Sequence, residues 1–289
     1  MKLGMWLRLG RVSNLPTVWT NVLCTLALSG ALSFSPRTFA LWGIFSLYYV
    51  GGMYLNDAFD RRIDAAQRPD RPIPSGQVSA ALVFGVGYAA LGLGTLLLGL
   101  VAQAAGVSVS RAVASGAGLA LTIIGYDVYH KQNPLSPLVM GLCRVMVYIA
   151  GAFAVSEVLA PEVAWGAGAL LCHLIGLSYA AKQEAFNRLT RAWPLGFLAA
   201  PAVYGAYLSL GEPWVRPFLA VFALWGVYSL RFLRPGPRRF VPGAVVRLIA
   251  GIALLDAMLI ASTGALGWAL LALLLAGITR LLQRVIPGT

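Results

Sequence analysis

Ten apolar segments of about 20 residues, joined by short polar loops, decide what this chain can fold into. A helix needs about 20 apolar residues to cross the hydrocarbon core of a membrane. Of the 289 residues, 59% are hydrophobic and 11% are charged, whereas soluble domains average about 25% charged residues. The sequence predicts an all-α, polytopic membrane bundle of nine to ten transmembrane helices. The expected spans are 15–33, 38–56, 79–101, 109–128, 136–155, 162–181, 193–210, 214–233, 243–262 and 264–283.

The connections between these segments are short, so residues 1–289 are expected to form a single membrane-embedded domain. Gly and Ala crowd the segments, as in 85–100, and small residues let helix backbones approach closely. The basic, then apolar, N-terminus is interrupted by Asn14 and Pro16, which favours a retained first span over a removed signal peptide. The three cysteines stand singly in apolar segments and predict neither disulfides nor a metal site.

The net charge of +12 is distributed in the pattern of a membrane protein. Most of the 22 Lys and Arg residues lie near the two termini and in the loops 57–78, 129–135, 182–192 and 234–242, which alternate along the chain. The positive-inside rule assigns that side to the cytoplasm. Both termini and these loops are therefore expected at the cytoplasmic face, in a membrane of the bacterial inner-membrane type. The sequence contains no basic run interleaved with aromatic residues, so it does not predict nucleic-acid binding.

The stretch 54–76 carries most of the acidic residues that could do chemistry. Asp57, Asp60 and Asp64 are spaced i, i+3, i+7, so they share one face of a helix. Three like charges on one face repel one another unless cations lie between them. Oxygen ligands at this spacing suit a hard divalent ion, above all Mg²⁺. The alternative is a solvated loop in which these acids pair with the arginines beside them: Arg61, Arg62, Arg68 and Arg71.

Polar residues inside or beside the spans are further candidates. Arg144 lies within a span, where an arginine either faces a polar cavity or extends to the interface. Lys131 follows Asp127 by four residues, so an ion pair at a helix end is the alternative to a substrate contact. Asp256 lies in mid-span, and a functional and a structural role are both open. Each of the two histidines lacks a neighbouring His or Cys at ligand spacing, which favours ordinary polar roles.

The motif Asn56-Asp-x-x-Asp-x-x-x-Asp, followed by Arg-Pro-x-Arg-Pro-x-Pro-Ser-Gly up to Gly76, resembles the first signature of the UbiA-type intramembrane prenyltransferases. The N-terminal segment from Arg8 to Asn21 is similar to the opening of that family. The stretch from Lys131 to Ala152, which includes Gly-x-x-Arg144, resembles its fourth-to-fifth helix region. The resemblance covers most of the chain, although ten spans would exceed the usual nine.

The resemblance implies a helical bundle around a lipid-facing cavity, in which an isoprenyl diphosphate docks on Mg²⁺ held by two aspartate motifs. It makes Asp57, Asp60 and Asp64 the metal ligands and assigns Lys131 and Arg144 to the diphosphate. These five residues form the predicted catalytic set. Substrate-binding roles are expected for six more residues: Asn21, Asn56, Arg68, Lys182, Glu184 and Asn187.

The second aspartate motif is where this sequence departs from the family. Residues 178–188 contain no aspartate, and Glu184 is their only acid. Glu184, with Gln183 or Asn187, offers ligands for one weaker metal site. Alternatively, Lys182 supplies the positive charge of a second Mg²⁺, or the site has lost that metal together with its catalytic power. The string Tyr179-x-x-Lys-Gln-Glu resembles the EboC-type branch of the family.

The predicted function is Mg²⁺-dependent transfer of an isoprenyl group from a prenyl diphosphate to an acceptor within the membrane. The acceptor is expected to be a small lipophilic molecule with an aromatic ring or an alcohol, while its identity and the length of the donor chain stay open. Two alternatives remain: a non-catalytic isoprenoid-binding or carrier protein, and a terpene cyclase that uses the same cation chemistry without an acceptor.

Overall fold

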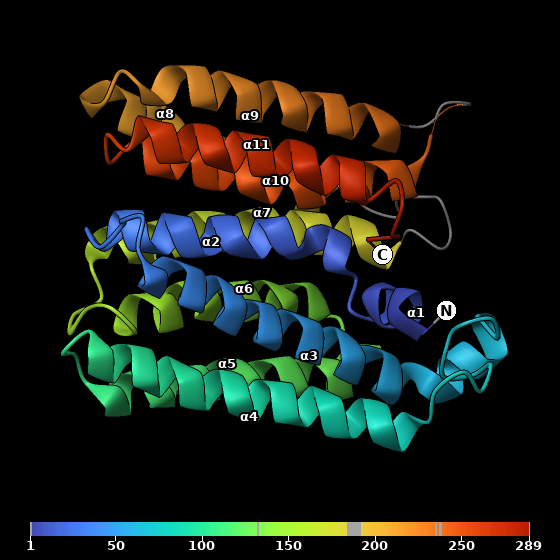
Figure 1. The fold of residues 1–289 in the computed structure, drawn as a ribbon. Helices are drawn as coiled ribbons and strands as arrows, with labels where there is room; N and C mark the ends of the chain where they lie inside the picture. The colour runs from blue at the N-terminus through green and yellow to red at the C-terminus, as the bar shows by residue number, and fades with distance from the viewer. Residues whose placement is uncertain (1, 132, 184–191, 235, 237–238, 289) are drawn as a thin grey trace.

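The computed structural model describes residues 2–131, 133–183, 192–234, 236 and 239–288, and within these ranges the chain is helical and contains no strand (Figure 1). The predicted all-α class is therefore confirmed. The helices are α1 (Lys2–Leu9), α2 (Leu15–Leu28), α3 (Pro36–Gln67), α4 (Ala80–Ala104), α5 (Val109–Tyr129), α6 (Ser136–Phe153), α7 (Pro161–Lys182), α8 (Ala200–Gly211), α9 (Val215–Leu230), α10 (Val241–Ala261) and α11 (Leu266–Leu282). Short 3₁₀ turns at Val12–Asn14, Trp193–Ala199 and Arg231–Leu233 extend three of them.

Every predicted apolar span corresponds to a helix in this structure. In the described ranges, eight helices, two of them counted with a 3₁₀ turn, are long and apolar enough to cross a membrane. The other two, α2 with 14 residues and α11 with 17, are shorter than the predicted spans 15–33 and 264–283. Helix α2 ends early because Gly30 adopts a left-handed φ of 66° that turns the chain.

Helix α3 is the element that positions the aspartate stretch. It has 32 residues and continues eleven residues beyond the predicted end of its span at residue 56, to Gln67. A helix of that length measures about 48 Å, which exceeds the hydrocarbon thickness of about 30 Å. Asp57, Asp60 and Asp64 therefore lie on regular helix, as their spacing predicts, and all three are buried.

Close packing of α3 against α4 depends on glycine. A Cβ atom at Gly87 of α4 would lie 2.8 Å from Cδ2 of Leu55, and one at Gly51 of α3 would lie 3.0 Å from the carbonyl oxygen of Gly87. Small residues at such crossings are how membrane helices approach one another. The close approach fixes the rotation of α3, and with it the face on which the aspartates lie.

Helix α10 runs through the interior of the bundle. In its most apolar window 89% of the residues are buried, more than in any other span of the described chain. It packs against α2, α7, α9 and α11. In contrast, large apolar side chains on outer helices are exposed, for example Leu96, Leu121 and Leu224, at 61 to 71%. An apolar exterior around a helical bundle is typical of a protein in lipid, and the chain is an integral, multi-pass membrane protein.

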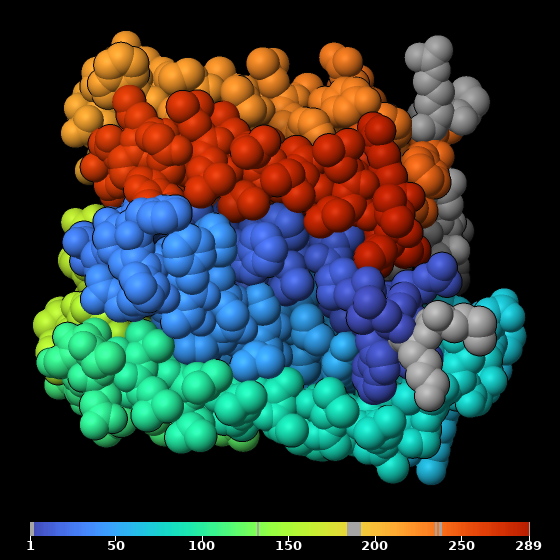
Figure 2. Space-filling model, in the orientation of Figure 1, coloured from blue at the N-terminus to red at the C-terminus, as the bar shows by residue number. Residues whose placement is uncertain are grey.

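The two termini lie at the same end of the bundle, where α3 ends and α4 begins (Figure 1). The C-terminal segment after α11 runs down beside the N-terminal segment (Figure 2). The Nδ2 atom of Asn14 donates to the carbonyl oxygen of Gly288 at 2.9 Å, and Nε2 of Gln283 donates to Oδ1 of Asn14 at 2.9 Å. These bonds fasten the chain end against the start of α2.

Candidate active site

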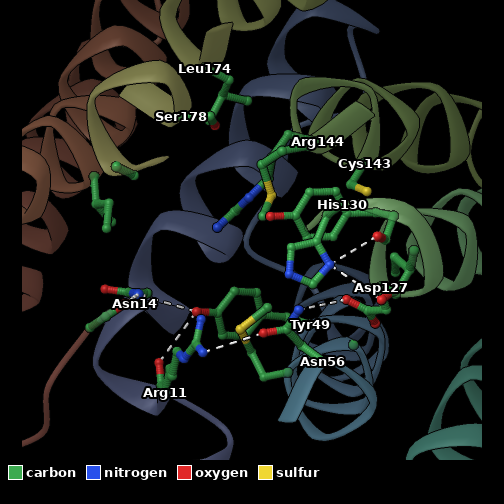
Figure 3. Close-up of a pocket in the computed structure, with 18 of the residues that line it drawn as sticks. Arg11, Asn14, Tyr49, Asn56, Asp127, His130, Cys143, Arg144, Leu174 and Ser178 are labelled. Carbon is green, nitrogen blue, oxygen red and sulfur yellow. Dashed lines mark hydrogen bonds between the residues drawn. The ribbon is translucent and has the colours of Figure 1, made fainter. Parts of the chain in front are cut away.

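A cavity of about 310 Å³ lies among α2, α3, α5, α6, α7 and α10. Part of its wall is polar, with charged and amide side chains from the N-terminal segment, α3, α5 and α6 (Figure 3). The rest is apolar and comes largely from α3, α5, α6, α7 and α10. The apolar wall includes Val18, Phe45, Leu119, Ile123, Val147 and Ile252. The space therefore suits a molecule with a charged head and a hydrocarbon tail.

Two arginines of the cavity wall, Arg11 and Arg71, hold the carboxylates of Asp57 and Asp64, which lie beside that wall and do not line the cavity themselves. Nη1 of Arg71 lies 3.1 Å from Oδ1 of Asp57 and 2.7 Å from Oδ2 of Asp64. Nη2 of Arg11 lies 3.3 Å from Oδ1 of Asp57. Arg71 follows the helix in a loop rich in proline, so α3 and the loop after it are joined by these charge-assisted bonds.

Arg11 reaches this group through an unusual backbone conformation. Its φ of 42° is the only positive φ of a non-glycine residue in the described chain, and such a conformation costs about 1 to 3 kcal/mol. Burial disfavours the charged guanidinium, but Asp57, Tyr49, Tyr126 and Asp60 together outweigh that effect, so the pKa of Arg11 is raised above its ordinary value. Arg11 is thus a fixed positive charge on the cavity wall.

Asp60 is paired with the end of α5. Its Oδ2 atom lies 2.8 Å from Nζ of Lys131 and 3.5 Å from Nε2 of His130. The alternative ion pair between Lys131 and Asp127 is not formed in the described structure; Lys131 reaches across to α3 instead. Lys131 and Asp60 both line the cavity.

Arg144 projects from α6 into the cavity and is held there by α2. Its Nη1 atom donates to Oδ1 of Asn21 at 2.8 Å, and its Nη2 atom donates to Oγ1 of Thr17 at 3.1 Å. The guanidinium carbon lies 5.4 Å from the centroid of the Tyr49 ring, within range of a cation–π interaction. Arg144 therefore faces a polar cavity and does not extend to the membrane interface, which was the alternative from the sequence.

Asp256 lies behind Arg144, fully buried on α10. Its carboxylate accepts hydrogen bonds from Oγ1 of Thr20 at 2.6 Å, Nδ2 of Asn21 at 2.8 Å and Oη of Tyr148 at 2.5 Å. A carboxylate can only accept and a guanidinium can only donate, so the Asn21 amide between them has a single compatible orientation. Asp256 thereby turns Oδ1 of Asn21 toward Arg144.

The remaining predicted site residues lie in different places. Asn56 and Arg68 line the cavity, whereas Asn21 is buried behind Arg144. Lys182 does not line it: its Nζ atom donates to the carbonyl oxygen of Asn133 at 2.7 Å and to Oγ of Ser136 at 3.1 Å. These bonds tie the end of α7 to the start of α6. Glu184 and Asn187 lie outside the described residues.

In the described chain, four Arg, Asp or His residues of the cavity wall were not among the predicted site residues: Arg11, Arg71, Asp127 and His130. For Asp127 a signal existed, since an acid within an apolar span is a functional candidate by default; the sequence pattern offered it only as an alternative partner of Lys131. Arg11 lies in the N-terminal segment that resembles the family opening. It contacts Asp57, 46 positions later in the chain, only because the fold brings the two residues together.

The side chains present fit a hard divalent cation by chemical type. In the ranges that the structure describes, no three His, Cys, Asp or Glu side chains form a ready-made metal cluster, because basic side chains hold three of the carboxylates. Asp127 differs: its Oδ2 atom is buried and has no hydrogen-bond partner. Buried polar atoms are almost always paired, so an oxygen left without a partner in a cavity of carboxylates fits an oxygen-ligated ion such as Mg²⁺.

Comparison with known proteins agrees with this architecture. The model of the UbiA prenyltransferase family matches residues 13–240. The chain belongs to the UbiA prenyltransferase family. The match begins just before α2 and extends to the start of α10, so it includes the aspartate stretch, Lys131 and Arg144. The predicted family is confirmed.

Similarity to curated members of the UbiA family is local. The chain is 42% identical over 102 residues to digeranylgeranylglyceryl phosphate synthase of Methanothrix thermoacetophila, which is 34% of this chain and 37% of the relative. It is 54% identical over 46 residues to the enzyme of the same name from Methanopyrus kandleri, 15% of this chain and 17% of the relative. The alignments thus span 37% and 17% of these relatives, so the chain matches only part of their length.

Similarity to solved UbiA structures extends over nearly the whole fold. A structure described as digeranylgeranylglyceryl phosphate synthase in membranes has a TM-score of 0.62 at 18% identity and covers 92% of this chain and 99% of its own. A UbiA homologue from Archaeoglobus fulgidus, bound to DMAPP and Mg²⁺, has a TM-score of 0.58 at 13% identity and covers 88% and 98%. At these identities the likeness shows the fold, and the predicted UbiA-like bundle is confirmed.

Proposed function

We propose that this protein transfers an isoprenyl group from a prenyl diphosphate to an acceptor within the membrane, in a Mg²⁺-dependent reaction. One observation carries the proposal: a cavity of about 310 Å³ has a charged end and an apolar remainder, in a chain of the UbiA family. The charged end suits a diphosphate, and the apolar part suits a hydrocarbon chain. We take residues 1–289 as a single membrane-embedded domain built for this chemistry.

Asp57, Asp60 and Asp64 are the residues that would hold Mg²⁺, which neutralises a departing diphosphate when bound. In the structure their carboxylates are held by Arg71, Arg11 and Lys131. A diphosphate brings oxygen atoms that these basic groups bind at least as well as a carboxylate. Binding of the substrate therefore lets the basic side chains exchange partners, and the carboxylates become available to the cation.

Arg144 acts on the same head group from the opposite side, because Asn21 and Thr17 hold its guanidinium at the cavity wall. Donors fixed before the reaction stabilise developing charge without a cost for reorganisation. When the bond between C1 of the isoprenyl chain and its oxygen breaks, the electron pair leaves with the diphosphate. The positive charge of Arg144, with those of Lys131 and Arg71, lowers the free energy of that charge separation.

The apolar wall protects the allylic cation that remains. Water would capture it, and side chains such as Phe45, Ile123 and Val147 exclude water from the space below the head group. The ring faces of Tyr49 and Tyr126, which also line the cavity, offer negative potential to a nearby cation. The acceptor then forms a bond to C1 and releases a proton.

An alcohol is the acceptor we favour between the two classes that the sequence leaves open. The curated relatives are named for a glyceryl phosphate product, which carries its prenyl groups on a glycerol unit. Arg68 and Arg11 at the cavity wall could serve an acceptor phosphate as well as the diphosphate. The charged end of the cavity lies near both termini, so we place it at the cytoplasmic face of an inner membrane of bacterial type, following the distribution of Lys and Arg.

The test is turnover by the purified protein in lipid nanodiscs. Dimethylallyl, geranyl and geranylgeranyl diphosphate are supplied with Mg²⁺ and with glycerol-phosphate lipids or aromatic acceptors, and release of diphosphate and mass of the product are measured. We expect Mg²⁺-dependent release and a conjugate with one added prenyl unit. A prenyl hydrocarbon or alcohol without a conjugate would indicate a cyclase, and tight binding without release would indicate a carrier. Either result would reject the transferase.

A further inference from the structure

Asp127 differs from the three aspartates of α3 in having no ion-pair partner among the described residues. Among the described residues, Asp57, Asp60 and Asp64 each form an ion pair with an arginine or a lysine. The Asp127 carboxylate forms none. Its Oδ1 atom accepts from Nδ2 of Asn56 at 3.0 Å, and its Oδ2 atom has no partner.

This arrangement is costly unless something occupies the free oxygen. Asp127 is only 4% exposed and lines the cavity near the end of α5. A buried carboxylate without a counter-charge is strongly destabilising, and proteins tolerate one where a cation or a hydrogen-bond donor completes it. The neighbouring Lys131 could have met it one turn along the same helix, yet it pairs with Asp60 on α3. The Oδ2 atom is thus left without a partner in a residue that lines the cavity.

The surrounding bonds hold the carboxylate in a fixed orientation. Asn56 donates from Nδ2 to Asp127, while its Oδ1 atom accepts from Nη2 of Arg11 at 3.4 Å. These two contacts determine which way the amide faces, and the amide in turn fixes Oδ1 of Asp127 (Figure 3). A ligand oriented by an outer hydrogen bond is the usual arrangement at metal sites. Asp60 lies one turn from Asn56 on the same face of α3, so two carboxylates flank this amide.

We propose that Oδ2 of Asp127 is a ligand of a divalent cation that enters the cavity with the diphosphate. This inference rests on the proposed function for the identity of the anion, and it assigns to α5 a metal ligand outside the Asp57–Asp64 motif. The cation is of the hard, oxygen-preferring class, with Mg²⁺ as the first candidate, and phosphate oxygens and water complete its coordination. Asp127 thereby offers a carboxylate ligand in a chain that lacks the second aspartate motif, since residues 178–188 contain no aspartate.

The first experiment measures binding of Mn²⁺, a paramagnetic substitute for Mg²⁺, by electron paramagnetic resonance in the presence of inorganic diphosphate. The variant is Asp127→Asn, which keeps an oxygen for the bond from Asn56 and removes the charge. The matched control is Asp70→Asn, since Asp70 is exposed in the loop after α3. We expect Mn²⁺ affinity to fall at least ten-fold in Asp127→Asn and to stay within two-fold of wild type in the control. Equal affinity in wild type and Asp127→Asn would overturn the assignment.

A second variant tests direct coordination. Asp127→Cys is made in a Cys143→Ala background, because Cys143 also lines the cavity. A thiolate ligand prefers Cd²⁺ to Mg²⁺, so Cd²⁺ should produce an ultraviolet thiolate-to-metal absorption band that Cys143→Ala alone does not show. A folded Asp127→Cys protein without that band would contradict the proposal even if the Asn variant were unstable.

Turnover on the same preparations separates this inference from the proposed function. If wild type transfers prenyl groups and Asp127→Asn binds Mn²⁺ as wild type does, only the Asp127 assignment fails. If wild type binds Mn²⁺ through Asp127 but releases no diphosphate from any prenyl donor, only the transferase proposal fails.

Discussion

The polar end of the cavity and the network behind Arg144 use the same residue types in opposite ways. At the polar end, Asp57, Asp60 and Asp64 are held by ion pairs with Arg11, Arg71 and Lys131. In the network, Asp256 receives three hydrogen bonds from side chains on α2 and α6 and is fully buried. The first set can exchange partners for a substrate, and the second cannot.

The difference follows from where the basic groups are anchored. Arg71 lies in the loop after α3, and Lys131 follows the end of α5, so both can move without disturbing a helix. Arg144 is in the middle of α6, and its two hydrogen-bond partners, Asn21 and Thr17, lie on α2. Basic residues that follow the end of a helix suit binding and release of a substrate. A basic residue held by helices suits a hydrogen-bond donor whose position must not change.

The largest effect is expected from breaking the fixed network. Asp256→Ala leaves the hydroxyls of Thr20 and Tyr148 and the amide of Asn21 without their acceptor, and removes the carboxylate that lies behind Arg144. Loss of one partner from a buried charged network costs about 3 to 5 kcal/mol. We expect a fall in the midpoint of thermal unfolding in detergent, measured by intrinsic fluorescence, and loss of expression at higher temperatures.

Asp256→Asn is the matched variant for that prediction, because it keeps the shape of the side chain and one acceptor oxygen. Its stability should lie between wild type and Asp256→Ala. If Asp256→Ala unfolded at the same temperature as wild type, the contrast between a fixed network and an exchangeable polar end would be wrong.

A smaller but still large effect is expected at the polar end. Asp60→Asn removes a charge that Lys131 balances and that we assign to the metal, so kcat/KM for prenyl transfer should fall about 10²- to 10³-fold. Stability should change little, because Asn still accepts the bond from Lys131 at the same place. Diphosphate release and thermal unfolding are measured on one preparation. A loss of stability as large as that of Asp256→Ala, with activity retained, would reverse the comparison.

How well the sequence predicts each of these two regions depends on how far apart in the chain the contacting residues are. The ten apolar segments and the shared face of Asp57, Asp60 and Asp64 depend on local periodicity, and the structure contains both. The Asp256 network joins Thr20 and Asn21 to a residue more than 230 positions away, and no local pattern indicates such a pairing. Helical spacing offered Asp127 as an alternative partner of Lys131, but in the structure Lys131 pairs with Asp60 on α3.

Arg144→Lys tests the link between the two regions. A lysine keeps the charge but has one nitrogen, so it can meet either Asn21 or Thr17 with less fixed geometry. We expect kcat/KM to fall about 10- to 100-fold, with the change mainly in kcat, because a misplaced donor affects charge that develops in the transition state. Steady-state kinetics with a prenyl diphosphate measure it. A change confined to KM would show that Arg144 contributes binding alone.

The smallest effect is expected for an ion pair outside the cavity. Nη1 of Arg111 lies 2.6 Å from Oε2 of Glu157, and both side chains are at least 50% exposed. Exposed pairs contribute about 0.2 to 1 kcal/mol, so Arg111→Ala should shift thermal unfolding slightly and leave prenyl transfer within two-fold of wild type. The short distance alone would suggest a strong bond, but solvent screens it, whereas the bonds of Asp256 are formed in the apolar interior. If Arg111→Ala destabilised the protein as much as Asp256→Ala, burial would not be what separates the fixed network from other ion pairs.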